Sequence, residues 1–125
     1  MKVKPITTIA PDGRNLSLSL GRDYEVLGIE ADCYRILNDP EKRPYGNDPV
    51  LFEPECFEVI DSTIPAFWTC STGADGEQYC YPPEWSEVGF FEDYHEGVES
   101  VRQQFWEDLQ RYYPETWQEI GRAHV

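Results

Sequence analysis

Apolar and polar residues alternate with a period of two in several short runs of the first sixty positions, a pattern typical of half-buried β-strands. Residues 24–30 and 33–38 are two such runs, and the tight Ala31-Asp32 connection predicts a β-hairpin between them. Further short strands or extended arms are predicted at 2–9, 16–20, 50–52 and 57–60, with an exposed loop at 38–49 and a tight or 3₁₀ turn at 53–55.

Short strands joined by short turns and one long loop favour a small antiparallel barrel or a strongly bent sheet over a parallel sheet with crossover helices. Four segments follow one another in this region: Gly21-x-x-Tyr24-Glu25-Val26-Leu27, Tyr34-Arg35-Ile36-Leu37-Asn38-Asp39, Leu51-Phe52-Glu53-Pro54 and Phe57-Glu58-Val59-Ile60-Asp61. Together they resemble the SH3-like small β-barrels of bacterial proteins, in which a short 3₁₀ turn precedes the closing strand. The resemblance covers residues 2–61 and implies the architecture only, because the peptide-binding groove of eukaryotic SH3 domains has no residue-by-residue match here.

Residues 62–92 predict an additional hairpin followed by a loop rich in aromatic and acidic residues. A register centred on residue 75 would place Cys70 opposite Cys80, close enough for a disulfide in an oxidising compartment. Residues 52–59 and 81–88 share an aromatic start, Pro-Glu and Glu-Val at matching offsets. We interpret this echo as a hairpin that extends the sheet, and chance similarity is the alternative.

The pattern of apolar and polar residues predicts a C-terminal helical segment over residues 93–120. Asp93 and Glu96 have the spacing of a capping box, and Pro114 ends the helix and begins a last turn. Apolar residues recur at steps of three and four, as on one helix face: Val98, Val101, Phe105, Leu109 and Tyr112. The fold expected is a single α+β domain over 1–125, in which an SH3-like antiparallel barrel or bent sheet (1–61) is extended by a hairpin (62–92) and packed against an amphipathic helix (93–120).

Acidic residues dominate the second half of the chain. The sequence carries 24 Asp and Glu against 10 Lys and Arg, a formal net charge of −14. Residues 1–52 hold eight acids and seven bases, so nearly all of the excess lies in residues 53–125. A surface with this charge repels nucleic acid and anionic membranes. The magnitude of the net charge also exceeds the value of about 2–8 that solubility needs in a small domain. Binding of a basic protein partner is the simplest reason for the excess of acidic residues. The alternative is that the carboxylates are solvated and serve only solubility.

Neither a signal peptide nor a transmembrane segment is recognisable in the sequence, so we expect a cytoplasmic protein. The four cysteines have no Cys-x-x-Cys spacing, and reduced thiols are the default expectation in that compartment. Pairing of Cys70 with Cys80 is the alternative that the hairpin register leaves open.

Residue types that carry catalysis are scarce. Nucleotide-binding, zinc-protease and serine-hydrolase motifs are absent from the sequence, and we expect no catalytic residue, cofactor or bound metal. His95, between Asp93 and Glu96, is placed to bind a divalent cation, but a solvent-facing first-turn histidine is the simpler interpretation. The other enzymatic alternatives are a cysteine nucleophile paired with His95 and an acid–nucleophile pair of carboxylates, although neighbouring carboxylates arise here by abundance alone.

The segment 79–94 interleaves aromatic and acidic residues around two prolines, a composition that suits a surface for a basic protein. With the acids of the following helix it supplies the candidate partner-binding residues: Glu84, Trp85, Glu87, Phe90, Phe91, Glu92, Asp93, Glu96, Glu99, Glu107 and Asp108. The alternative for the aromatic members is that they seal the sheet against the helix, with the acids facing outward.

We therefore expect a non-enzymatic binding protein that engages a cationic protein. In size and charge, though not in motif, it resembles the immunity proteins that cover basic toxins. The alternative is an SH3-like accessory or regulatory domain, such as a phage-borne one, that binds a peptide in an aromatic groove of Tyr24, Tyr34, Tyr45 and Trp68. A small hydrolase that uses a carboxylate pair is the weaker alternative.

Overall fold

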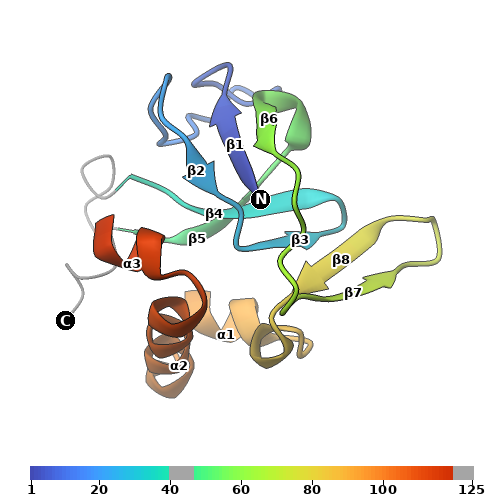
Figure 1. Ribbon diagram of the computed structural model, residues 1–125, viewed down its shortest axis with the longest axis vertical. Coiled ribbons are helices and arrows are strands. Elements are labelled where there is room, and N and C mark those ends of the chain that lie inside the picture. The colour runs from blue at the N-terminus through green and yellow to red at the C-terminus, as the bar shows by residue number, and fades with distance from the viewer. Residues whose placement is uncertain (40–46, 120–125) are drawn as a thin grey trace.

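The computed structural model describes residues 1–39 and 47–119, which form an α+β domain with two antiparallel sheets (Figure 1). The first sheet has the order β2-β1-β6 and contains β1 (Lys2–Pro5), β2 (Tyr24–Glu25) and β6 (Phe57–Asp61). The second has the order β5-β4-β3-β8-β7 and contains β3 (Gly28–Glu30), β4 (Cys33–Leu37), β5 (Pro49–Phe52), β7 (Thr69–Thr72) and β8 (Gln78–Tyr81).

Short helical elements complete the chain. The 3₁₀ turn η2 (Pro54–Cys56) separates β5 from β6, as predicted, and a second one, η3 (Pro83–Trp85), follows β8. The helices α1 (Phe90–His95) and α2 (Glu99–Tyr112) lie on the side of the five-stranded sheet that faces away from the first sheet (Figure 1). The last helix, α3 (Pro114–Glu119), reaches the first sheet, because Glu115 is paired with Lys2 of β1 and Thr116 donates a hydrogen bond to Glu25 of β2. No helix within the described ranges is long and apolar enough to cross a membrane.

The segment 24–30 runs through both sheets. Tyr24 pairs with Val3 in the first sheet, and Ile29 pairs with Tyr34 in the second. Between these pairings, the Leu27 N–H donates to a β4 carbonyl at 2.8 Å. One bent segment therefore joins the two sheets. Each sheet keeps its own edge strands in the described part of the chain, so the strands do not close into the predicted barrel.

Both predicted hairpins are confirmed. The β3–β4 connection consists of Ala31 and Asp32, whose φ angles of 49° and 67° are the positive values that a type I′ turn requires. In the β7–β8 hairpin, Cys70 pairs with Cys80, as a register centred on residue 75 demands. These two cysteines form a disulfide, where reduced thiols were the default expectation.

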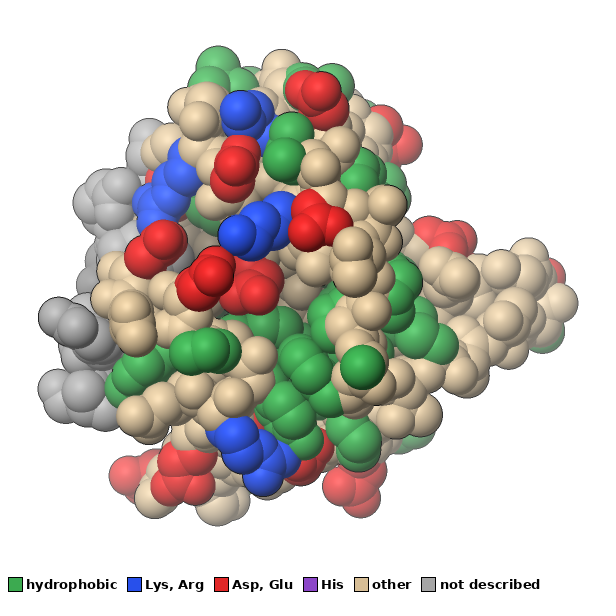
Figure 2. All heavy atoms as spheres, in the orientation of Figure 1, with side chains coloured by type: hydrophobic (Ala, Val, Ile, Leu, Met, Phe, Trp, Pro, Cys, Tyr) green, Lys and Arg blue, Asp and Glu red, His purple; other side chains and the backbone are tan. Residues whose placement is uncertain are grey.

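The β7–β8 hairpin extends the five-stranded sheet because β8 pairs with β3, and it projects from the body of the molecule (Figures 1 and 2). The echo between 52–59 and 81–88 has a structural counterpart over its first part. In both segments a strand ends and a 3₁₀ turn begins at the aligned proline, Pro54 or Pro83. The segments then diverge, because β6 follows η2 whereas α1 follows η3.

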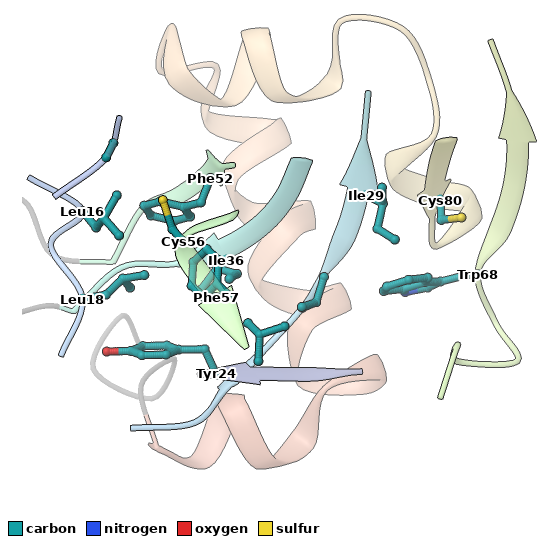
Figure 3. Packing of buried hydrophobic residues seen from close by; sticks show 13 residues of the cluster. Leu16, Leu18, Tyr24, Ile29, Ile36, Phe52, Cys56, Phe57, Trp68 and Cys80 are labelled. Atoms are coloured by element: carbon teal, nitrogen blue, oxygen red, sulfur yellow. The ribbon is translucent and has the colours of Figure 1, made fainter. Parts of the chain in front are cut away.

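Alternation along the strands of the five-stranded sheet divides the core into two clusters. The first lies between the sheets, where Ile29, Ile36 and Cys80 point toward the first sheet, and Figure 3 shows Trp68 beside Ile29 and Cys80. The second lies against the helices and is built largely from aromatic rings: its members are Leu27, Leu37, Tyr81, Trp85, Phe90, Phe91, Tyr94, Phe105, Leu109 and Tyr113. Apart from α3, which contacts the first sheet, the domain is thus layered as sheet, sheet and helices.

The C-terminal segment is divided where one helix was predicted, and Asp93 lies inside α1 instead of capping a longer helix. Gly97 has a φ of 87°, and its N–H donates to the Tyr94 carbonyl at 3.1 Å. The Val98 N–H donates to the Asp93 carbonyl at 3.0 Å, which completes a Schellman motif that ends α1. The predicted break at Pro114 is confirmed, because α3 begins there.

The helix α2 buries Phe105 and Leu109, which are members of the predicted apolar face. The ring that follows α2, Tyr113, is also buried and links the two core clusters. Its hydroxyl accepts a hydrogen bond from the Trp68 indole at 2.8 Å and donates one to the Leu27 carbonyl at 2.8 Å. This chain of hydrogen bonds ties the C-terminal helices to the sheet.

Gly28 packs directly against the Tyr81 ring. An added Cβ would overlap that ring and lie 2.9 Å from the Cys80 carbonyl oxygen, so Gly28→Ala must shift β8 or the ring. We expect the free energy of unfolding, measured by urea denaturation, to fall by about 1–3 kcal/mol. Glu58→Ala, at an exposed position of β6, is the control and should change it by less than about 0.5 kcal/mol. Wild-type stability in Gly28→Ala would contradict this contact.

The Cys70–Cys80 disulfide closes a short loop in a hairpin whose edge strand is exposed along its whole length. Because a crosslink restricts the unfolded chain, Cys70→Ser should lower the free energy of unfolding by about 2–3 kcal/mol. Urea denaturation with and without dithiothreitol measures this, and reduction should leave Cys70→Ser unchanged. Cys33→Ser, which removes a free thiol, is the matched control. Equal midpoints for the oxidised and reduced wild type would show that the crosslink contributes nothing.

Candidate functional site

A pocket of about 280 Å³ opens between the β7–β8 hairpin and the segment that leads into α1. One wall is formed by residues of the hairpin, the other by residues 85–92, and Glu30 of β3 contributes a carboxylate between them. We call this the acidic–aromatic pocket, because aromatic rings and the carboxylates of Glu30, Glu87 and Glu92 make up most of its lining.

Strand alternation builds the hairpin wall. The wall residues are the neighbours of the two cysteines along each strand: Thr69, Ser71, Tyr79 and Tyr81. Since successive side chains point to opposite faces, the disulfide lies on the face away from the pocket. Cys80 is accordingly buried in the core cluster between the sheets.

A tight turn shapes the opposite wall. The Phe90 N–H donates to the Glu87 carbonyl at 3.2 Å, and Gly89 has φ 90° and ψ −3°, the conformation that a type II turn needs at its third position. The turn leaves Val88 fully exposed at the pocket, while Phe90 is buried beneath it. An apolar side chain is thus presented to solvent beside two carboxylates.

A buried arginine lies behind the pocket. Arg35 of β4 is only 4% exposed, and its guanidinium donates to Glu30 Oε1 and to the Tyr81 hydroxyl, each at 3.0 Å. A third bond reaches the Pro49 carbonyl at 3.0 Å, and the guanidinium carbon lies 4.0 Å from the centroid of the Phe91 ring. Each of the three guanidinium nitrogens donates one hydrogen bond and the group also lies over an aromatic ring, which offsets its desolvation.

Tyr81 completes this network. Its hydroxyl donates to Glu30 Oε1 at 2.9 Å. Arg35 donates to the same oxygen, so Oε1 accepts two hydrogen bonds. Burial raises the pKa of Tyr81, against the opposing effect of the Arg35 charge, and the phenol therefore stays protonated and remains a donor at neutral pH. Glu30 is held in one orientation with its carboxylate partly exposed to the pocket.

The three aromatic candidates have a structural role. Trp85 is 1% exposed and stacks on Phe105 of α2, with ring centroids 4.7 Å apart. Phe90 and Phe91 are also buried in the helix-side cluster. They seal the sheet against the helices, as the alternative interpretation predicted, and they also supply the aromatic base of the pocket.

Two of the acidic candidates are occupied by contacts within the molecule. Glu84 is ion-paired with Arg111 and accepts a hydrogen bond from the Tyr112 hydroxyl at 2.7 Å. Asp108 accepts a hydrogen bond from the Trp85 indole at 3.1 Å. These carboxylates anchor η3 to α2 and are not free to meet a partner.

The other acidic candidates lie on the surface. We define the acidic strip as the exposed carboxylates on the pocket turn, on α1 and at the start of α2: Glu87, Glu92, Asp93, Glu96 and Glu99. No Lys or Arg within the described ranges forms an ion pair with any of them. The nearby Arg102 donates instead to the Tyr94 carbonyl at 2.8 Å.

Glu107 is exposed outside the strip, where it accepts a hydrogen bond from Gln103 and borders an open groove on α2 and α3. The face of the molecule in Figure 2 differs from the strip, because acidic and basic side chains alternate over its upper half. Among the described residues, Lys2 is paired with Glu115 and Lys4 with Asp23. The acidic strip is therefore a region of unbalanced negative charge, and the exposed acids Glu55 and Glu58 on η2 and β6 likewise have no ion pair with a described Lys or Arg.

The residues of the alternative peptide groove do not form one exposed surface. Tyr24 is buried, with its hydroxyl 2.6 Å from Asp39, and Trp68 is buried with its indole bonded to Tyr113. Tyr34 is half-buried and packs edge-on against a core ring, and Tyr45 lies outside the described residues.

The residues considered for catalysis are engaged elsewhere. His95 Nε2 lies 3.2 Å from the Pro49 carbonyl oxygen, and no group of three His, Cys, Asp or Glu in the described part is placed to hold a metal ion. Burial raises the pKa of the free thiols of Cys33 and Cys56, which disfavours the nucleophilic thiolate.

Comparisons with known proteins give no relative for this chain: no family model, curated protein or solved structure matches it.

Several residues of the pocket were not among the sequence candidates, namely Glu30, Tyr79 and Val88, together with Arg35 behind it. One signal was available, since Arg35 interrupts an apolar run in a strand predicted to be half-buried. The pairing of β8 with β3, which brings these residues together, has no local signature.

Burial raises the pKa of Asp108, although the Trp85 hydrogen bond acts in the opposite direction. Ionisation of this carboxyl is therefore disfavoured in the folded state, and stability is lost as the pH rises through its titration. We expect Asp108→Asn to be more stable than the wild type at neutral pH. The difference should vanish below the ordinary carboxyl range, where both states carry a protonated Asp108.

Urea denaturation at a series of pH values measures this difference. Glu107→Gln removes the same charge from an exposed neighbour, so it reports the general relief of charge repulsion. A gain in Asp108→Asn no larger than in Glu107→Gln at neutral pH would contradict a specific cost of burying Asp108.

Proposed function

We propose that this protein is a non-enzymatic binding protein whose acidic strip and pocket engage a basic protein, in the manner of an immunity-type inhibitor. The observation that carries the proposal is the acidic strip itself. Its five carboxylates are exposed within thirteen residues of chain and have no Lys or Arg partner among the described residues.

Electrostatics explains why such a strip suits a partner. Like charges that lie close together repel one another and lower the stability of the isolated fold. A cationic surface that covers them removes this repulsion and is attracted over several ångströms before contact. Association should consequently be fast and sensitive to salt, and it should depend on the strip more than on acids elsewhere.

The SH3-like architecture of residues 2–61 belongs to the same proposal as its scaffold. Two observations support this part of the proposal: the bent segment 24–30 serves both sheets, and β6 follows a 3₁₀ turn, as the resemblance implies for the closing strand. The peptide-groove function of an SH3-like accessory domain has less support, because Tyr24 and Trp68 are buried in the core.

Charge reversal tests the proposal. Wild-type protein and Asp93→Lys/Glu96→Lys are immobilised and exposed to an extract of the cells that produce the protein, and the retained proteins are identified by mass spectrometry. We expect the wild type to retain a protein of basic isoelectric point that the variant does not retain. With that protein purified, the dissociation constant should rise about tenfold or more in the variant, and also between about 50 mM and about 500 mM salt.

The matched control is Glu55→Lys/Glu58→Lys, which reverses two exposed acids on η2 and β6, on the opposite side of the molecule from α1 and α2 (Figure 1). This variant has the same net charge as the strip variant but should bind like the wild type. Equal weakening of binding by both variants would show that only the net charge matters and not the strip. A dissociation constant that does not change with salt concentration would refute the electrostatic account.

A further inference from the structure

We propose that the acidic–aromatic pocket receives a single arginine side chain from the partner. This inference rests on the proposed function and names the group that the partner inserts. It comes from four properties of the pocket: its volume, its aromatic lining, its unbalanced charge and the apolar residue at its edge.

The volume suits one side chain. Sites for drug-sized ligands span about 300–1,000 Å³, and this pocket, at about 280 Å³, lies just below that range. An extended side chain can enter it from a partner surface that rests on the hairpin and on the segment 85–92. The hairpin that forms one wall of the pocket projects from the body of the molecule (Figure 2).

The lining already binds a guanidinium from the inner side. Arg35 is held by a carboxylate oxygen of Glu30, by the Tyr81 hydroxyl and by the ring of Phe91. All three of these partners also contribute to the pocket lining. A planar, weakly hydrated guanidinium stacks on aromatic rings more favourably than a strongly hydrated ammonium does, so arginine fits this lining better than lysine.

The charge of the pocket favours a cation. Arg35 compensates Glu30, but Glu87 and Glu92 line the pocket without a cationic partner in the described part of the chain. Both hydrogen bonds that hold Glu30 end on Oε1, and no described residue donates to Oε2. An incoming guanidinium can therefore bond a fixed carboxylate oxygen and neutralise the two acids nearby.

Val88 provides the remaining contact. Its side chain is fully exposed and lines the pocket on the turn between Glu87 and Phe90. An arginine side chain carries its charge on an apolar stem, and such stems pack on apolar surface while the charged head reaches polar groups. The pocket thus offers an apolar contact for the stem and carboxylates for the head.

The probe that tests this inference is N-acetyl-arginine amide, titrated into the oxidised full-length protein and followed by ¹H–¹⁵N correlation spectra. We expect saturable shifts confined to residues 85–92, the hairpin wall and the Trp85 indole. The citrulline analogue, which has the same shape without the charge, should bind about tenfold more weakly or not at all. The lysine analogue should also bind more weakly than the arginine one.

Two variants locate the binding. Glu87→Gln/Glu92→Gln changes only exposed side chains and should weaken the arginine probe about tenfold, whereas Glu55→Gln/Glu58→Gln should leave its affinity unchanged. Equal binding of the citrulline or lysine analogue, or equal weakening by the two variants, would overturn the inference. So would shifts spread along the acidic strip and not centred on the pocket.

Failure here is distinguishable from failure of the proposed function. Asp93 and Glu96 do not line the pocket, so their reversal tests the strip alone. Salt-sensitive partner binding that Asp93→Lys/Glu96→Lys weakens and Glu87→Gln/Glu92→Gln leaves intact would refute the arginine pocket while the proposed function stands. Saturable arginine binding with no basic partner retained would refute the proposed function while the arginine pocket stands.

Discussion

Arg35 carries its positive charge between β4 and α1, where water hardly reaches it. A guanidinium in such a place is destabilising by several kcal/mol unless it is paired and fully hydrogen-bonded. Its partners Glu30, Tyr81, Pro49 and Phe91 come from four other elements, β3, β8, β5 and α1. Satisfying one charge therefore fixes how the added hairpin and the first helix sit against the sheet. The pocket is the outer side of the same arrangement, so its shape depends on interactions that also hold the layers together.

The distribution of charge follows from where the few cations are needed. Arg35 lies in the core, and Arg22 reaches the buried carboxylate of Asp39 at 3.4 Å. Arg111 is paired with Glu84 between η3 and α2. Cations that brace the fold are unavailable to the surface carboxylates near α1. The acidic strip is thus part of the unpaired surplus of a chain in which acids outnumber bases, and its position beside an aromatic pocket distinguishes it from the other unpaired acids.

Local features were predictable and long-range ones were not. The Ala31-Asp32 hairpin, the first 3₁₀ turn and the break at Pro114 depend on neighbouring residues, and the structure confirms all three. Gly97 lies inside the helical segment predicted over 93–120, but a glycine with positive φ ends a helix through the Schellman hydrogen bonds. The strands do not close into a barrel, and β8 pairs with β3. Both outcomes depend on contacts between residues that are far apart in the sequence, and the local pattern of apolar and polar residues does not indicate such contacts. For the same reason, the sequence indicated the acids of the strip but not Glu30, which β-sheet pairing brings to the pocket.

The exposed strand β7 has a consequence for how copies of this protein behave toward one another. It lies at the end of the five-stranded sheet, and its residues Thr69–Thr72 are exposed and uncharged, so its outer backbone groups are open to another strand. Edge strands commonly avoid such pairing with a proline or a charged side chain, and β7 has neither. Mutual repulsion between molecules that each carry a net charge of −14 can take over that protective role. The acidity that we propose attracts a basic partner would then also oppose self-association, and concentrated salt, by screening the charge, would remove both effects together.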